Sequence, residues 1–392
     1  MMMRKLARRL LALALAVLLS FVLLEVLVRV AGFDVPVVWV PDTRYGWLLL
    51  PGARRHYLEE GDGLIEVNQL GFRDRERSLA KPAGTYRIAF FGDSMTESCQ
   101  VNLNQTFCYL LEEKLRSPQR PVEVLNFGVS GYAPLQELLL FQDLGPKYKP
   151  DLVVLAIFLD NDVSGSDPRL SVLHYGVPYA TFDGDRMMID YSQPQQSYDD
   201  YHKKPWYWLR THSALYRAAV DSWWRLRLLA EDRAKHNKAT GTAAEVPQRF
   251  ILYQPTVPPA WQDAWSKFEK VTLAFAEEAR RQGVKLLILS LPPGHVIVKS
   301  SWQTMLDQYP IMKDQTWDLD GPSRRFQEFS AQHQLPLYQP FDEMAKDPGG
   351  RDLFIDGLRH LTPQGHIALA RLIETRLRAE LEAPPRPVET QR

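Results

Sequence analysis

The sequence predicts a three-layer α/β/α domain, in which helices cover a central parallel sheet of five strands, preceded by an N-terminal transmembrane helix. Two observations support this prediction. From Tyr86 onward, short apolar runs alternate with stretches of helical length, which is the pattern of β-α-β units in a parallel sheet. At the amino terminus, a long uncharged segment follows a cluster of basic residues.

The first 33 residues have the composition of a membrane anchor. An uncharged run covers residues 10–24 and continues through Glu25 and Arg29 to about Phe33. A helix of this length spans a hydrocarbon core of roughly 30 Å, and Glu25 and Arg29 lie one turn apart, where they can pair. The basic residues before the run are Arg4, Lys5, Arg8 and Arg9. Because basic flanks stay in the cytoplasm, we expect everything after Phe33 to be extracytoplasmic, in the periplasm.

A cleaved signal peptide is the alternative for this segment. Its cleavage site would have small residues in an Ala-x-Ala pattern. The segment shows no clear site of this kind and has Arg29 where the small residues would stand. We therefore expect residues 1–33 to remain as an uncleaved anchor.

The rest of the chain divides into a wrapping segment, an interrupted domain and a tail. Residues 34–85 are rich in Pro, Gly and Arg without sustained periodicity, so we expect irregular structure that wraps the domain. The α/β pattern covers residues 86–383 and breaks at about 164–255, which we interpret as an insertion or lid. Residues 384–392 are Pro-rich, and we expect them to be disordered.

The helices and strands of the domain are predicted from the length and composition of each run and from the residues that begin or end it. Helical spacing of Phe268, Val271 and Phe275 predicts one helix, which Gly283 closes, and Thr362 with Pro363 begins the last helix as N-cap and first position. The predicted strands cover residues 87–91, 122–127, 152–159, 284–291 and 335–338. The predicted helices cover residues 106–116, 135–144, 261–282, 321–332 and 363–381.

Composition excludes several classes of protein. The chain has 392 residues, 45% of them hydrophobic, and a net charge of zero with both signs interleaved, which is unlike a nucleic-acid-binding protein. No Cys/His cluster has metal-ligand spacing, so we expect neither a metal nor another cofactor. The two cysteines, Cys99 and Cys108, either pair, as an oxidising compartment permits, or pack as buried thiols.

Four short segments carry the residues for ester chemistry. Ser94 follows the first predicted strand in Gly92-Asp-Ser94, and an Asn-x-Gly-x-x-Gly segment that ends at Gly131 follows the second. Asn161 follows the third strand, and His360 precedes the last helix. Strand ends of a parallel sheet meet at one edge, so these residues can converge. A serine, a histidine base, a carboxylate and hydrogen-bond donors are what acyl transfer needs.

The order of these segments resembles the SGNH/GDSL hydrolase superfamily. The resemblance covers roughly residues 70–382 outside the insertion, and the segment 67–74 upstream is similar to membrane-anchored bacterial members. It implies a flavodoxin-like fold, with Ser94 as nucleophile and His360 as base. It also implies an oxyanion hole made by the backbone N–H groups of Ser94 and Gly131 and the side chain of Asn161. The carboxylate behind His360 would be Asp356.

The sequence departs from the family pattern at two places. Leu159 stands where a glycine usually precedes the asparagine by two residues. Three residues separate Asp356 from His360, whereas the family usually has two, so Asp352 remains as an alternative carboxylate. His366 is the competing base, but it lies in the first turns of the last helix, a position that is not catalytic in the family pattern.

Three functions remain open at this point. The first is a membrane-tethered esterase that forms a covalent acyl-serine intermediate on an acyl or acetyl ester of an envelope glycan or lipid. The second is an O-acyltransferase or deacetylase of an envelope polysaccharide, and the third is a non-catalytic glycan-binding module, against which the intact Ser94, Asn161 and His360 argue. Three alternatives are open for the aromatic residues of the insertion: they line a substrate pocket, they form the core of a lid, or they rest at the membrane interface. They are Tyr201, Trp206, Tyr207, Trp208, Trp223 and Trp224.

Overall fold

The fold is described from a computed structural model of the whole chain. It describes residues 2–117, 121–171, 176–184, 186–238, 246–355 and 359–382. The chain forms two compact units, one of Met1–Val38 with Tyr198–Gly241 and one of Trp39–Ser197 with Thr242–Arg392. The predicted disordered tail at 384–392 lies outside the described residues.

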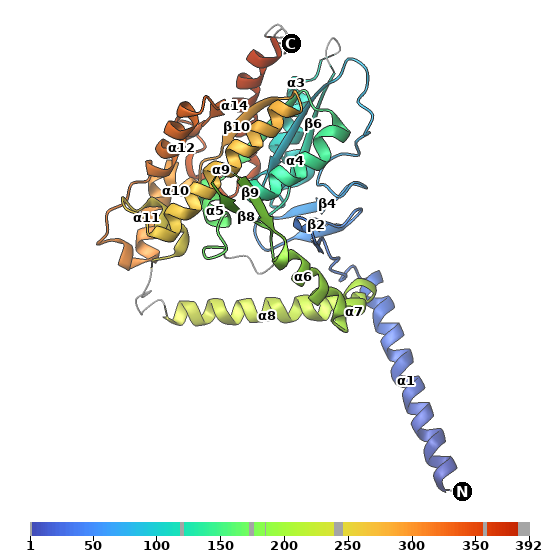
Figure 1. Cartoon of the computed structure of the whole chain (residues 1–392). Helices are drawn as coiled ribbons and strands as arrows, with labels where there is room; N and C mark the ends of the chain where they lie inside the picture. Colours follow the sequence, from blue (N-terminus) through green and yellow to red (C-terminus); the bar gives the residue numbers. More distant parts are fainter. Residues whose placement is uncertain are drawn as a thin grey trace. The chain divides into compact units, whose positions relative to one another are not determined.

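The larger unit contains the predicted parallel sheet of five strands (Figure 1). The strands lie in the order β11 (Leu337–Tyr338), β10 (Lys285–Ser290), β7 (Leu152–Ile157), β5 (Tyr86–Gly92) and β6 (Val122–Gly128). All neighbouring strands are parallel. Gly92 of β5 lies level with Gly128 of β6 and Ala156 of β7, so three strands end together at one edge. The chain runs from β5 to β6 on one side of β5 and then crosses to β7 on its other side. Such a switch point is where open α/β sheets place their sites.

Helices cover both faces of the sheet, as predicted. Successive strand residues point to opposite faces, so the ring of Phe90 lies 5.5 Å from Phe107 on one side and the ring of Phe91 lies 5.4 Å from Phe141 on the other. The first face carries α3 (Phe107–Leu115) and α14 (Pro363–Glu382), and the second carries α4 (Pro134–Tyr148) and α9 (Pro259–Arg281). The result is a three-layer α/β/α domain.

Shorter helices surround this framework. The strand predicted at 152–159 ends at Ile157, because residues 159–165 turn into a helix that carries Asn161. The α-helices are α2 (Ser94–Glu97), α5 (Leu159–Gly165), α6 (Ser192–Lys203), α10 (Gly294–Ile297), α11 (Lys299–Gln308), α12 (Gly321–Gln332) and α13 (Phe341–Ala345). Short 3₁₀ helices cover Leu103–Gln105, Gln248–Tyr253, Pro310–Met312 and Gly350–Leu353.

Two segments expected to be irregular contain antiparallel hairpins. In the segment 34–85, β1 (Trp39–Asp42) pairs with β2 (Gly46–Leu49), and β3 (Arg54–Tyr57) pairs with β4 (Gly63–Glu66). In the insertion, β8 (Tyr179–Asp183) pairs with β9 (Arg186–Asp190). These strands have only four or five residues, which is too short for a two-residue period to stand out in the sequence.

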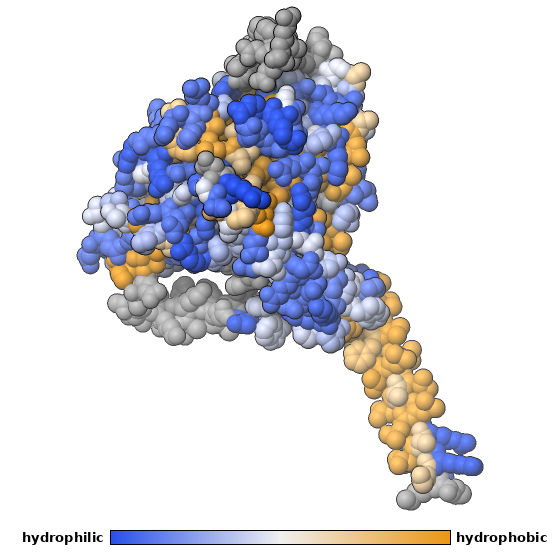
Figure 2. Space-filling view, in the orientation of Figure 1, coloured by the Kyte–Doolittle hydropathy of each residue, from blue (hydrophilic) through white to orange (hydrophobic). Residues whose placement is uncertain are grey.

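The smaller unit joins the amino-terminal helix to part of the insertion. Helix α1 (Met2–Val30) is long and apolar enough to cross a membrane. Figure 2 shows a hydrophobic surface along α1, with hydrophilic side chains near its amino end. The insertion contributes α7 (Trp206–His212) and α8 (Ala214–Lys238). The side chains of Trp206, Trp208, Trp223 and Trp224 are exposed, so they do not form the core of a lid.

The carboxylate of Glu25 joins α1 to the start of α8. It accepts hydrogen bonds from the Ser213 hydroxyl at 2.8 Å and from the backbone N–H groups of Ala214 at 2.7 Å and Leu215 at 2.9 Å. A carboxylate at this position satisfies unpaired N–H groups and favours the positive end of the helix dipole. Asp34 and Arg217 form a second link, an ion pair of 2.7 Å.

The side chain of Arg87 on β5 bonds the segment 34–85 to the sheet. Its fully buried guanidinium pairs with Glu123 at 2.7 Å and donates to the carbonyl oxygens of Ser78, Leu79 and Tyr148. We expect Arg87→Met to lower the free energy of unfolding by about 3 to 5 kcal/mol, because it leaves a carboxylate and three carbonyls without these donors. Thermal and urea unfolding of the detergent-solubilised chain measure the loss.

Arg116→Met is the matched control for Arg87→Met. Arg116 pairs with Glu113 at 2.7 Å, but its side chain is 54% exposed. Exposed ion pairs contribute at most about 1 kcal/mol. Equal losses in the two variants would contradict the role assigned to the buried guanidinium.

Candidate active site

Ser94 is the first residue of a helix that begins where β5 ends. Asp93 caps this helix, since its Oδ1 accepts a hydrogen bond of 2.9 Å from the backbone N–H of Met95. The N–H groups of the first helical turn have no partner within a helix, which leaves the N–H of Ser94 unused by α2. The turn therefore presents both a hydroxyl and a backbone donor at the carboxyl edge of the sheet.

His360 lies beside Ser94, although 266 residues separate them in the sequence. The distance between Ser94 Oγ and His360 Nε2 is 2.9 Å. The loop of His360 is held by a bridge between Phe354 and Leu361 and by a hydrogen bond of 2.8 Å from the Ile355 N–H to the His360 carbonyl. The structure thus brings together the two residues that the sequence analysis chose as nucleophile and base.

The carboxylate at the other side of the imidazole is Glu60, which the sequence analysis did not name. Glu60 Oε2 lies 2.6 Å from His360 Nδ1. Asp356, the carboxylate expected there, lies outside the described residues, and Asp352 forms no described bond to His360. Among the described residues, Glu60 is therefore the carboxylate that contacts His360, at the place where Asp356 was expected. No family motif marks it, and its only sequence signal is its place in an acidic, glycine-containing turn, Glu59-Glu60-Gly61-Asp62-Gly63.

The charge on Glu60 settles which ring nitrogen of His360 carries the proton. Burial opposes ionisation of Glu60, but the hydrogen bond and charge of His360, with the charge of Arg359, hold the pKa of Glu60 below its ordinary value. An ionised carboxylate only accepts hydrogen bonds. His360 therefore donates from Nδ1 to Glu60, and its Nε2 is free to accept the proton of the Ser94 hydroxyl.

The β3–β4 hairpin brings Glu60 to the site by close backbone contact with residues 99–102. The Asp62 N–H donates to the Gln100 carbonyl at 3.2 Å, and the Leu64 N–H donates to the Asn102 side chain at 3.0 Å. A Cβ built on Gly63 would lie 2.2 Å from the Cys99 carbonyl oxygen, so only glycine permits this approach.

Arg73 fastens the same hairpin to the helix of Ser94. Its fully buried guanidinium donates to the carbonyls of Glu97 at 3.0 Å and Ser98 at 2.8 Å, at the end of α2. It also donates to the carbonyl of Leu64 on β4 at 3.2 Å. One side chain therefore bonds both the element that carries Glu60 and the element that carries Ser94.

The expected oxyanion donors lie around the same turn. Asn161 Nδ2 donates to Asp93 Oδ2 at 2.7 Å, and its second hydrogen is free for another acceptor. The loop that contains Gly131 is tied to β5 by a hydrogen bond of 3.0 Å from Val129 N–H to the Gly92 carbonyl. Gly131 has a φ of +81°, a conformation that glycine adopts without strain. These contacts tie Asn161 and the loop of Gly131 to Asp93 and Gly92, the two residues that precede Ser94.

His366, the competing base, has a structural role. Its Nδ1 accepts a hydrogen bond of 3.2 Å from the backbone N–H of Phe107, and its ring stacks on the Phe107 ring. Burial, with the positive charges of Arg73 and His360, lowers the pKa of His366 to about 3. A neutral, buried imidazole that already accepts a backbone bond is not available to Ser94.

The cysteines are separate buried thiols. Cys99 and Cys108 are both free and buried, and Cys99 donates to Glu97 Oε1 at 2.9 Å. Burial raises the pKa of both thiols, which disfavours the reactive thiolate. The described residues contain no group of three or more His, Cys, Asp or Glu that could hold a metal ion.

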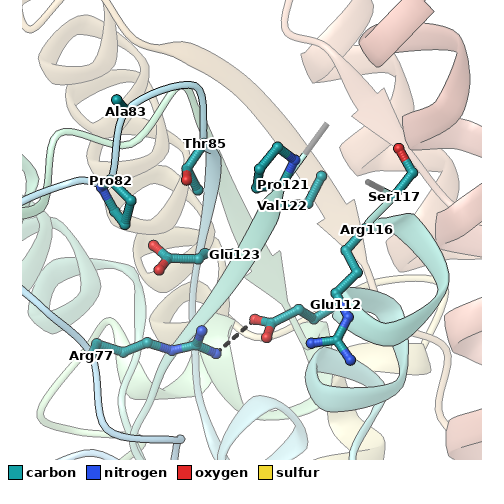
Figure 3. Close-up of a pocket in the computed structure, with 10 residues that line it drawn as sticks. All are labelled: Arg77, Pro82, Ala83, Thr85, Glu112, Arg116, Ser117, Pro121, Val122 and Glu123. Atoms are coloured by element: carbon teal, nitrogen blue, oxygen red, sulfur yellow. Dashed lines mark ion pairs between the residues drawn. The ribbon is translucent and has the colours of Figure 1, made fainter. Parts of the chain in front are cut away.

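A separate pocket of about 720 Å³ lies at the opposite edge of the sheet (Figure 3). It is lined by the beginnings of β5 and β6, including Thr85 and Val122, and by the end of α3. Arg77 and Glu112 form an ion pair of 2.8 Å in its wall. Because Arg77 also pairs with Asp74, these charges are matched within the protein and leave no free charge for a ligand.

No model of a protein family matches the chain, and no curated protein matches it. Solved structures similar to it include a lipase/acylhydrolase from Enterococcus faecalis, with 13% identity, 75% of this chain and 96% of that chain covered, and a TM-score of 0.37. Another is the psychrotrophic esterase EstA from a Pseudoalteromonas species, with 11% identity, coverage of 76% and 99%, and a TM-score of 0.38. A GDSL-like lipase from Bacteroides thetaiotaomicron has 11% identity, coverage of 75% and 88%, and a TM-score of 0.34. These are acylhydrolases and esterases, the group that the sequence motifs resemble.

The pKa of His366 predicts how stability depends on pH. Below about pH 6.5 an unfolded histidine gains a proton, whereas the folded His366 stays neutral down to about pH 3. The unfolded state then binds more protons, so His366 reduces stability as the pH falls from about 6.5 toward 3. We expect His366→Gln, which can still accept the Phe107 bond, to lose less stability than the wild type over this range.

Thermal unfolding of both proteins between neutral and acidic pH measures this difference. His333→Gln is the control, because His333 is exposed. Parallel curves for His366→Gln and the wild type would contradict the assignment.

Proposed function

We propose that the protein is a serine ester hydrolase that acts through a covalent acyl-serine intermediate. The observation that carries this proposal is the line of Ser94 Oγ, His360 and Glu60, with distances of 2.9 Å and 2.6 Å. A hydroxyl, an imidazole and an ionised carboxylate in this order activate a nucleophile for acyl transfer.

Each group has one task in the reaction. As Ser94 Oγ bonds to the ester carbonyl carbon, His360 Nε2 takes the hydroxyl proton and Glu60 stabilises the resulting imidazolium. The N–H groups of Ser94 and Gly131 and the amide of Asn161 stabilise the negative charge on the carbonyl oxygen. His360 then returns the proton to the leaving alcohol, and a water molecule that it activates in the same way releases the acid and frees Ser94.

The substrate we propose is an acyl or acetyl ester of an envelope glycan or lipid, reached from a membrane anchor. The support for an anchor is that Glu25 and Asp34 bond the end of α1 to α8. Removal of residues 1–33 would break the three hydrogen bonds that Glu25 accepts from the start of α8, whereas Asp34 would stay with Arg217. The exposed tryptophans of α7 and α8 belong to the same unit, and tryptophan favours the membrane interface.

Variants of the triad test the chemistry. We expect Ser94→Ala and His360→Ala to reduce kcat on a short-chain nitrophenyl ester by about 10⁴ or more, since the residues act as a unit. A fluorophosphonate should label Ser94 in the full-length, detergent-solubilised chain. An unlabelled Ser94 together with no ester turnover would rule out the enzyme.

The carboxylate is tested by comparing Glu60→Gln with Asp356→Asn and Asp352→Asn. Glu60→Gln removes the charge behind His360, and loss of such a charge costs about 10⁴ in kcat. We expect the two aspartate variants to change kcat much less and to leave KM similar. A large loss in Asp356→Asn with a small one in Glu60→Gln would return the role to Asp356.

The anchor is tested by the mass and location of the protein in cells. We expect the intact amino terminus in the membrane fraction, resistant to extraction by salt and alkaline carbonate, because α1 spans the bilayer. A soluble product that starts after about Phe33 would show that the segment is a cleaved signal peptide.

A further inference from the structure

Arg249 is a half-buried guanidinium beside the proposed active site. It lies in the 3₁₀ turn Gln248–Tyr253, with its Cζ 4.7 Å from the ring centre of Phe250. Its described hydrogen bond is a weak one of 3.7 Å to the sulfur of Met305. Burial and the positive charge of Arg359 lower the pKa of Arg249, while Asp160 opposes them.

A chain of contacts connects Arg249 to the serine. The Phe250 ring packs 5.4 Å from the ring of His295, and His295 Nε2 lies 3.8 Å from Asp160 Oδ2. Asp160 is the neighbour of Asn161, whose amide bonds to Asp93 next to Ser94. These contacts connect the turn of Arg249 to Asp160 and Asn161, and the charge of Asp160 acts on Arg249.

Arg359 brings a second guanidinium to the same place. It directly precedes His360, it is exposed, and its charge acts on Glu60, Arg249 and His295. Two described carboxylates nearby already have other partners, because Glu60 binds His360 and Asp160 accepts from the hydroxyl of Tyr253. Within the described ranges, neither Arg249 nor Arg359 forms an ion pair.

Two neighbouring guanidiniums without a counter-ion are unfavourable in the free protein. They repel each other, and the partial burial of Arg249 removes part of the water that would screen its charge. An anion between them would relieve both costs and receive charge-assisted, planar hydrogen bonds, which suit carboxylates and phosphates. This arrangement is therefore suited to an anionic ligand.

We propose that Arg249 and Arg359 bind a carboxylate or phosphate group on the alcohol part of the ester substrate. This inference rests on the proposed hydrolase function and narrows its substrate to an ester of an acidic alcohol, such as an acidic sugar. The alcohol part is indicated because His360 must return its proton to the leaving oxygen, so the leaving group passes His360 and its neighbour Arg359. The acyl group, which is neutral in this proposal, would then lie on the side of the ester carbonyl away from Arg359.

Binding to the Ser94→Ala variant of the full-length, detergent-solubilised chain tests this proposal, because the ligand stays uncleaved. One ligand pair is the acetylated methyl glycoside of galacturonic acid and its neutral methyl ester. The other pair is acetylated galactose with and without a phosphate monoester. In calorimetry at low salt we expect at least one anion to bind about tenfold tighter than its neutral partner, with the difference shrinking as salt is added.

Added Arg249→Gln or Arg359→Gln should abolish the preference for the anion. Added Arg116→Gln is the control and should retain it, since Arg116 lies at the end of α3, in the pocket at the opposite edge of the sheet. A preference in the galacturonate pair alone identifies a carboxylate, and one in the phosphate pair alone identifies a phosphate. Equal binding within both pairs, no binding of either anion, or a preference that survives both arginine variants would overturn the proposal.

The binding result is independent of turnover. The hydrolase proposal fails if the wild type neither cleaves a nitrophenyl ester nor reacts with a fluorophosphonate. The anion site fails on the calorimetry of the Ser94→Ala variant, whatever the wild type does to the ester. The two failures are therefore distinguishable.

Discussion

The buried guanidinium of Arg73 is the interaction on which the geometry of the site depends most. It bonds the last carbonyls of α2 and a carbonyl of β4, although these elements belong to different parts of the chain. A planar group with several donors can hold several carbonyls in one arrangement. Since α2 begins with Ser94 and the β3–β4 hairpin carries Glu60, this bonding connects the elements of two residues of the proposed triad. His360 enters between them from the loop before α14.

The pKa values of several carboxyl groups near this edge shift in different directions. Desolvation raises the pKa of Asp93, Glu137 and Asp162 and favours their neutral forms. Glu60 is the exception, because His360 and Arg359 favour its ionised form. The negative charge beside the His360 imidazole therefore comes from Glu60 on the β3–β4 hairpin, which is not part of the central sheet. Positive charge from Arg249 and Arg359 stays without an ion pair among the described residues, and this imbalance is what an anionic substrate would correct.

Much of the fold could be predicted from the sequence. The five strands of the sheet and the helices α3, α4, α9, α12 and α14 follow from runs that are long enough to show a period, with glycine, threonine and proline at their ends. The hairpins β1–β2, β3–β4 and β8–β9 could not be predicted, because their stability comes from pairing and packing instead of from a local pattern. The union of the insertion with the amino-terminal segment was also missed, since the carboxylates of Glu25 and Asp34 bond to residues that are far away in the sequence.

The sequence by itself determined Ser94, Gly131, Asn161 and His360 as candidates, because each follows a strand or precedes a helix and parallel strands end at one edge. Only the tertiary structure showed that Glu60 lies against His360. His360 Nδ1 bonds to Glu60, 300 residues away in the sequence, while proximity along the chain had favoured Asp356. A hydrogen bond requires only that two atoms lie about 3 Å apart. A hairpin that carries the carboxylate can meet this requirement wherever it stands in the sequence. Distance in sequence therefore carries no information about that contact, whereas the order of strands and helices carries a great deal about the sheet.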